Sequence, residues 1–240
     1  MNDTDTDRRQ ALAQLAAWTA LAALPLAARD ARALSLADLS NRDAAAALKA
    51  ALEQGANVAV QLLGKTDGFW GNDRVRIPLP EWLQRGETAL KLMGRGRDVE
   101  ELKLGVNRAA EGAVPEARNL LVNAVRTMSV QDAKSILTGG DDSVTRFFAE
   151  KTRAPLATRF LPIVTKVTDR IGLARQYNAL AGQGEMLGLV KPDQARIERH
   201  VTVKALDGLY LMIGEEEKKV RQDPASAAAA IAKKVFGALK

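Results

Sequence analysis

Few residues of this 240-residue chain are suited to catalysis or metal binding, because it has no cysteine and a single histidine, His200. The lack of cysteine excludes disulfides, thiolate nucleophiles, zinc fingers and iron–sulfur ligation, and one imidazole excludes any site that needs two. His200 has no serine, aspartate or second histidine at a telling spacing, so we expect it to have a structural role. We therefore expect no metal, no cofactor and no catalytic residue that can be named.

The segment from Gly64 to Asp73 is the least helical stretch and the strongest candidate for a binding site. It holds three glycines and two adjacent aromatic residues, Phe69 and Trp70. Two interpretations of the rings stay open. They line or cover an apolar cavity, with Lys65 and Asp67 as polar contacts, or they plug the core between two helices.

A second polar group lies farther along the chain, where Asn107, Arg108 and Glu111 share one face of an expected helix. The group is either a polar network inside a bundle or a solvated ion pair on a helix face. Together with the glycine and aromatic segment it completes the candidate ligand-binding set: Lys65, Asp67, Phe69, Trp70, Asn107, Arg108 and Glu111.

The first 33 residues are predicted to be an export signal. Arg8 and Arg9 precede an apolar run over residues 11–28, and Ala31-Arg32-Ala33 is a small-x-small cleavage site. The arginine pair indicates the twin-arginine route, which carries folded proteins across the bacterial inner membrane. We expect cleavage to leave a periplasmic helical domain over residues 34–240 with no stable transmembrane anchor. An uncleaved anchor, or a helix of the domain itself, is the alternative.

The net positive charge of the chain favours anionic binding partners. The chain has 35 Lys+Arg against 29 Asp+Glu, a formal net charge of +6. A basic protein outside the cytoplasm meets anionic lipid headgroups or cell-wall polymers rather than nucleic acid. We expect a lipid or other amphiphilic small molecule, an envelope protein or a second copy as the partner.

Apolar residues recur at helical spacing through the rest of the chain, which predicts an all-α, single-domain bundle of about nine helices with one irregular loop. Ser129 with Asp132, and Asp98 with Glu101, predict capping boxes, and Pro155 and Pro162 predict boundaries or kinks. Residues 74–80 form at most an edge strand. The expected helices cover residues 40–63, 80–94, 98–113, 115–128, 130–137, 144–171, 173–180, 193–219 and 224–236.

Seven short segments carry a resemblance to a known family: residues 63–69, 77–80, 107–111, 139–141, 162–164, 204–209 and 216–218. In these segments, and from about Leu36 to Phe236, the chain resembles the bacterial family of exported helical proteins catalogued as domain of unknown function number 4197. The alanine-rich stretch from Ala225 to Ala230 departs from the family pattern. Because no lipobox cysteine is present, the resemblance implies a soluble periplasmic protein rather than a lipid-anchored one. It implies no activity.

The function that these observations favour is non-enzymatic binding of an apolar or amphiphilic small molecule, or of a partner protein, near residues 64–80. One alternative is an envelope hydrolase that uses carboxylates such as Glu111 and Asp141, which requires two acids to converge in one cleft. Asp141 and Asp142 are also well placed to cap a helix. The other alternative is a structural, self-associating helical protein.

Overall fold

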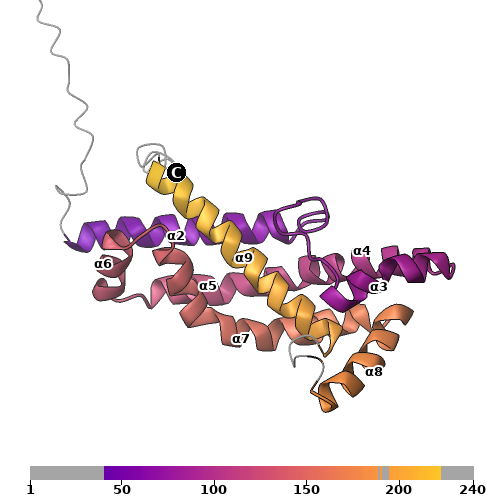
Figure 1. Ribbon diagram of the computed structural model, residues 1–240. Coiled ribbons are helices and arrows are strands. Elements are labelled where there is room, and N and C mark those ends of the chain that lie inside the picture. Colours follow the sequence, from indigo (N-terminus) through magenta and orange to yellow (C-terminus); the bar gives the residue numbers. More distant parts are fainter. Residues whose placement is uncertain (1–40, 189, 191–194, 223–240) are drawn as a thin grey trace, which may run out of the picture. The chain divides into compact units, whose positions relative to one another are not determined.

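The computed structural model describes residues 41–188, 190 and 195–222, and this part of the chain is all-α (Figure 1). The predicted fold class is therefore confirmed. The predicted number of about nine helices was wrong for the described residues, which form eight α-helices and one 3-10 helix. These are α2 (Asn41–Leu63), α3 (Glu81–Leu92), α4 (Gly96–Ala113), η1 (Val114–Glu116), α5 (Ala117–Arg126), α6 (Val130–Thr138), α7 (Ser143–Thr168), α8 (Gly172–Met186) and α9 (Ile197–Gln222).

The prolines of α7 do not divide it, contrary to expectation. The helix is continuous over 26 residues and contains both Pro155 and Pro162. A proline leaves the carbonyl group four residues earlier without its helical donor. Here the prolines are exposed, as are Lys151 and Thr158, which carry those two carbonyls, so water can take the place of the missing donors. α8 is also longer than predicted. The export signal, Asp193 and the last expected helix lie outside the described residues.

The core lies where α7 and α9 pack together, with α4 against both of them and α2 against α9 and α5. Each of these helices contributes the apolar face that its sequence period predicts. Fully or almost fully buried members include Val60, Leu63, Leu102, Val106, Phe148, Leu156, Phe160, Val201, Ala205 and Leu209. Among the described helices, none combines the length and the apolarity that crossing a bilayer requires.

Two capping boxes were predicted at helix starts, and one of them is present. At α6 the predicted capping box is present: Ser129 accepts from the N–H of Asp132, and the Asp132 carboxylate accepts from the N–H of Ser129. The box predicted at Asp98 was wrong. α4 begins at Gly96, and the Asp98 carboxylate accepts hydrogen bonds from the Arg95 guanidinium instead.

The start of α7 is capped from another helix. Asp142 occupies the N-cap position but makes no capping bond with its side chain, which pairs with Arg146. The buried carboxylate of Glu217, on α9, accepts from the Ser143 hydroxyl at 3.3 Å and from the N–H of Val144 at 3.4 Å. A negative charge is favourable at this end of a helix, so Glu217 ties α9 to α7 where sequence reasoning had placed a local cap.

Candidate functional site

The chain between α2 and α3, residues 64–80, forms a tight series of turns that we call the connector. The N–H of Gly64 donates to the carbonyl of Val60 at 2.8 Å. The N–H of Gly68 donates to that of Lys65, and the N–H of Gly71 to that of Asp67, both at 3.0 Å. Asp67 adopts a positive φ of 64°, a conformation that is uncommon for residues other than glycine but that aspartate tolerates.

Gly68 is required where the connector turns back over the end of α2. A Cβ atom at this position would lie 2.4 Å from the carbonyl oxygen of Leu63 and 2.6 Å from that of Leu62. Both contacts are with backbone atoms, which a rotamer change cannot move. The glycine therefore permits a close approach that any side chain would prevent.

Glu111, on α4, holds the connector from the inside. Its Oε1 atom accepts hydrogen bonds from the backbone N–H groups of Phe69 at 3.0 Å and Trp70 at 3.1 Å. Its Oε2 atom accepts from Arg108 Nη1 at 2.6 Å. The residue is only 4% exposed, so its charge is neutralised almost entirely by protein donors rather than by water.

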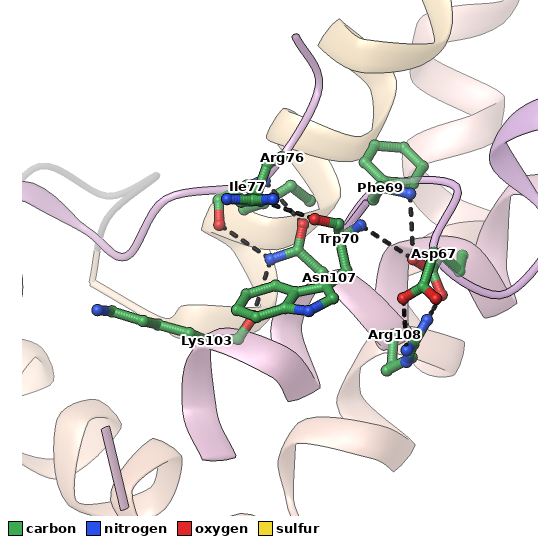
Figure 2. Close-up of polar contacts among 9 residues, drawn as sticks. Asp67, Phe69, Trp70, Arg76, Ile77, Lys103, Asn107 and Arg108 are labelled. Carbon is green, nitrogen blue, oxygen red and sulfur yellow. Dashed lines mark hydrogen bonds and ion pairs between the residues drawn. The ribbon is translucent and has the colours of Figure 1, made fainter. Parts of the chain in front are cut away.

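Arg108 connects Glu111 to the tip of the connector. Its second terminal nitrogen, Nη2, donates to Asp67 Oδ1 at 2.8 Å (Figure 2). Hydrogen bonds to Glu111 and then to Asp67 raise the pKa of Arg108, so the guanidinium stays protonated. Arg108 and Asp67 are partly exposed, whereas Glu111 is buried. The network thus starts at the buried Glu111 and reaches the surface through Arg108 and Asp67, so this helix face combines the two interpretations.

Asn107 binds the second half of the connector as a neighbouring strand would. Its Oδ1 atom accepts from the N–H of Ile77 at 2.8 Å, and its Nδ2 atom donates to the carbonyl of Ile77 at 3.1 Å (Figure 2). Nδ2 also donates to the carbonyl of Lys103. Residues 76–80 follow a turn at residues 73–75 and have no regular secondary structure; Ile77 and Leu79 are buried, but the described residues around them contain no partner strand. One fully buried amide side chain takes that role.

Phe69 plugs the core. Its side chain is fully buried, and it packs against α9 at Gly208, where a Cβ atom would lie 2.8 Å from the ring atom Cε1. In this conformation the ring has no surface for a ligand. Gly208 is a residue of the site that sequence reasoning missed, as is Arg76, which contacts Trp70. Gly208 lies in segment 204–209, which carries part of the family resemblance, but no local spacing connects it with Phe69.

Trp70 points the other way and is partly exposed. The guanidinium carbon of Arg76 lies 5.1 Å from the centre of the indole, a cation–π distance, and Arg76 Nε donates to the carbonyl of Trp70 at 2.7 Å (Figure 2). Arg76 also pairs with Asp73 at 3.0 Å. Lys65 is exposed at the surface of the connector and is not joined to this network. The structure therefore brings six of the seven candidate residues together.

His200 has the structural place that we expected. It is buried on α9, and its Nε2 atom lies 2.8 Å from the carbonyl oxygen of Pro78, within hydrogen-bond distance. Three helix residues, His200, Asn107 and Glu111, thus contact the connector backbone at three places along its length.

The carboxylates of the hydrolase alternative are not gathered in one place. Glu111 and Asp67 share the Arg108 guanidinium beside the connector. Asp141 and Asp142 lie in the turn before α7, and Figure 1 shows this turn and the connector near opposite ends of α2. Within the described ranges, no three residues of the types His, Cys, Asp or Glu are grouped so that they could hold a metal ion. Among these four acids of the described chain, Asp141 and Asp142 therefore do not join Glu111 in one cleft, as the hydrolase alternative requires.

Four of the segments that carry the family resemblance, 63–69, 77–80, 107–111 and 204–209, come together in this site. No curated protein and no solved structure matches the chain. A family model described as Protein of unknown function (DUF4197) matches residues 38–237, nearly the whole chain. The chain therefore belongs to this family.

Proposed function

We propose that this protein is an exported, non-enzymatic binding protein that recognises a partner protein through the outer face of the connector. The observation that carries the proposal is the partly exposed indole of Trp70 beneath the Arg76 guanidinium, on a backbone that α4 and α9 hold from the inside. Tryptophan and arginine are enriched among the residues that dominate binding energies at protein interfaces.

The held backbone supports binding because it lowers the entropic cost of complex formation. A mobile loop loses conformational freedom when it binds, whereas a preorganised one has already lost it on folding. The N–H groups of Phe69, Trp70 and Ile77 are all occupied by side chains of α4. The outer face, with Lys65, Trp70 and Arg76, is thus presented in one conformation. An apolar cavity lined by Phe69 is not part of the proposal, because that ring belongs to the core.

Export remains a prediction from the arginine pair and the cleavage site. Native mass spectrometry of the full chain, expressed with its leader in a bacterium and purified from the periplasmic fraction, tests location and partner together. We expect a mature N-terminus at Leu34 and an added mass in the range of a protein. Recovery only from the cytoplasm would contradict export.

Substitution of Trp70 tests the connector itself. We expect Trp70→Ala to weaken partner binding about 30-fold, the effect of a hot-spot residue that contributes roughly 2 kcal/mol. Arg76→Gln should weaken it less. Arg146→Gln, at an exposed arginine near the start of α7 that pairs with Asp142 as Arg76 pairs with Asp73, is the matched control and should retain the partner fully. Equal retention by all variants would overturn the proposal, and a retained mass of a few hundred daltons would assign the face to a small amphiphile instead.

A further inference from the structure

The most exposed large hydrophobic side chains of the described residues gather on two pieces of chain. Met186 is 88% exposed, Leu92 85%, Met93 74%, Leu187 73% and Leu180 61%. Leu92 and Met93 lie at the end of α3, and the other three lie on α8 or directly after it. We call these five residues the apolar face. Such a concentration of exposed apolar side chains is typical of an interaction site.

The turn after α3 lies beside the first half of α8. In the turn after α3, Arg95 Nη1 donates to Gln176 Oε1 on α8 at 2.6 Å. One turn of α3 and one of α8 are also joined by Trp82 and Tyr177, whose rings stack with their centres 4.9 Å apart. α8 turns Leu173 and Tyr177 inward, and Leu180, seven and three residues after them, lies at the edge of that inward side and is nevertheless exposed. In Figure 1 α8 starts on the side of α3 and runs toward the start of α9, so the end of α8 lies away from the turn after α3.

Basic residues lie at one end of the apolar face, in the turn after α3 and at the start of α8. Arg97, Arg170 and Arg175 are exposed and form no ion pair with any acid among the described residues. Lys91 and Arg95 lie at the same turn, where each is paired with acids. Over its whole length α8 has a single acidic residue, Glu185. Exposed apolar side chains are thus bordered by cationic groups that lack a counter-charge in the described part of the chain.

We propose that the apolar face is a peripheral binding surface for a lipid bilayer with anionic headgroups. Leu92 and Met93 project from a helix end, as Met186 and Leu187 do, and such side chains can enter the boundary between headgroups and acyl chains. Long arginine side chains keep their guanidinium groups at headgroup phosphates while their stems remain in apolar surroundings. This surface shares no residue with the outer face of the connector, so it is independent of the proposed function.

Charge and residue type argue against the two other occupants. In a two-fold dimer built on this face the same patch meets itself, which would bring the arginines of one copy toward those of the other. Protein interfaces depend on tryptophan and tyrosine anchors, but the aromatic side chains here stack on each other and Tyr177 is buried. Leucine, methionine and arginine at convex helix ends suit a soft, negatively charged surface better.

The test is co-sedimentation of the full chain with vesicles of phosphatidylcholine alone and of phosphatidylcholine with phosphatidylglycerol. We expect binding to the anionic vesicles only, and much weaker binding at 1 M salt, where screening acts within about 3 Å. The double variant Leu92→Ser/Met93→Ser and the charge variant Arg97→Gln/Arg175→Gln should each bind about tenfold more weakly. Val130→Ser, at an exposed valine of α6, is the matched control and should bind as the parent chain does.

Three outcomes would overturn the inference. The first is that the parent chain does not sediment with anionic vesicles, or sediments equally with both vesicle types. The second is that the variants bind as well as the parent chain, which would place the contact on another segment such as the N-terminal apolar run. The third is that light scattering shows a dimer for the parent chain and a monomer for the Leu92→Ser/Met93→Ser variant, which would make a second copy the occupant. Circular dichroism and thermal melting of each variant exclude unfolding as the cause, and the substituted side chains are exposed in any case.

Discussion

Replacing Glu111 by alanine is expected to lower the free energy of unfolding by about 3 kcal/mol, because it removes a buried carboxylate that satisfies two backbone N–H groups. The carboxylate accepts from the N–H groups of Phe69 and Trp70 and from Arg108. Alanine leaves the N–H groups of Phe69 and Trp70 without this acceptor, whereas the partly exposed Arg108 keeps its hydrogen bond to Asp67. Urea denaturation followed by circular dichroism measures the change.

Two substitutions separate the parts of this effect. Glu111→Gln keeps an oxygen that can accept from the two N–H groups but removes the charge opposite Arg108, so a smaller loss is expected. Asp67→Asn keeps an oxygen that can accept from Arg108 but removes the charge, and because the two side chains are 55% and 34% exposed it should cost no more than about 1 kcal/mol. If Glu111→Ala loses less than Asp67→Asn, Glu111 does not hold the connector as described here.

Gly68→Ala is the second substitution with a large expected effect, a loss of about 3 kcal/mol in the free energy of unfolding. The added Cβ would lie 2.4 Å and 2.6 Å from the backbone oxygens of Leu63 and Leu62. Relief requires the end of α2 or the connector to move, and the connector is bound to α4 on its other side. Thermal and urea unfolding of the variant measure the loss.

Gly105→Ala is the matched control, because the clash is closer but lies against a flexible group. A Cβ at Gly105 would be 2.2 Å from Cδ1 of Ile171, the far end of a side chain that can rotate. Inside α4 the change from glycine to alanine also favours the helix by about 1 kcal/mol. We expect a variant of nearly unchanged stability. Equal losses at both glycines would show that distance alone, and not the kind of atom met, decides the cost.

Local signals in the sequence predicted some elements well. The apolar period of α2, α4 and α9 places the residues that are buried, and the Ser129 capping box involves atoms only three residues apart. Where the deciding contact was distant, the prediction failed. The start of α7 depends on Glu217 from α9, and α7 continues through Pro155 and Pro162 because their side of the helix faces solvent.

For the candidate site too, local patterns were predicted from the sequence and contacts between distant residues were not. Helical spacing alone indicated that Asn107, Arg108 and Glu111 share a face, and composition alone marked the connector as irregular. Neither indicated that Glu111 would accept from Phe69 and Trp70. The two neighbouring aromatic residues look equivalent in the sequence, yet one is fully buried against Gly208 and the other is partly exposed under Arg76.

The sequence by itself determined the all-α class, most helix positions and the location of the irregular connector, because these follow from hydrophobic period, glycine and proline over a few neighbouring residues. Only the tertiary structure decided which ring of the connector enters the core, which side chains hold its backbone, and that the turn after α3 lies beside the first half of α8. Each of these depends on packing between residues far apart in the chain, and the burial of a polar group is stable only where such distant partners satisfy it.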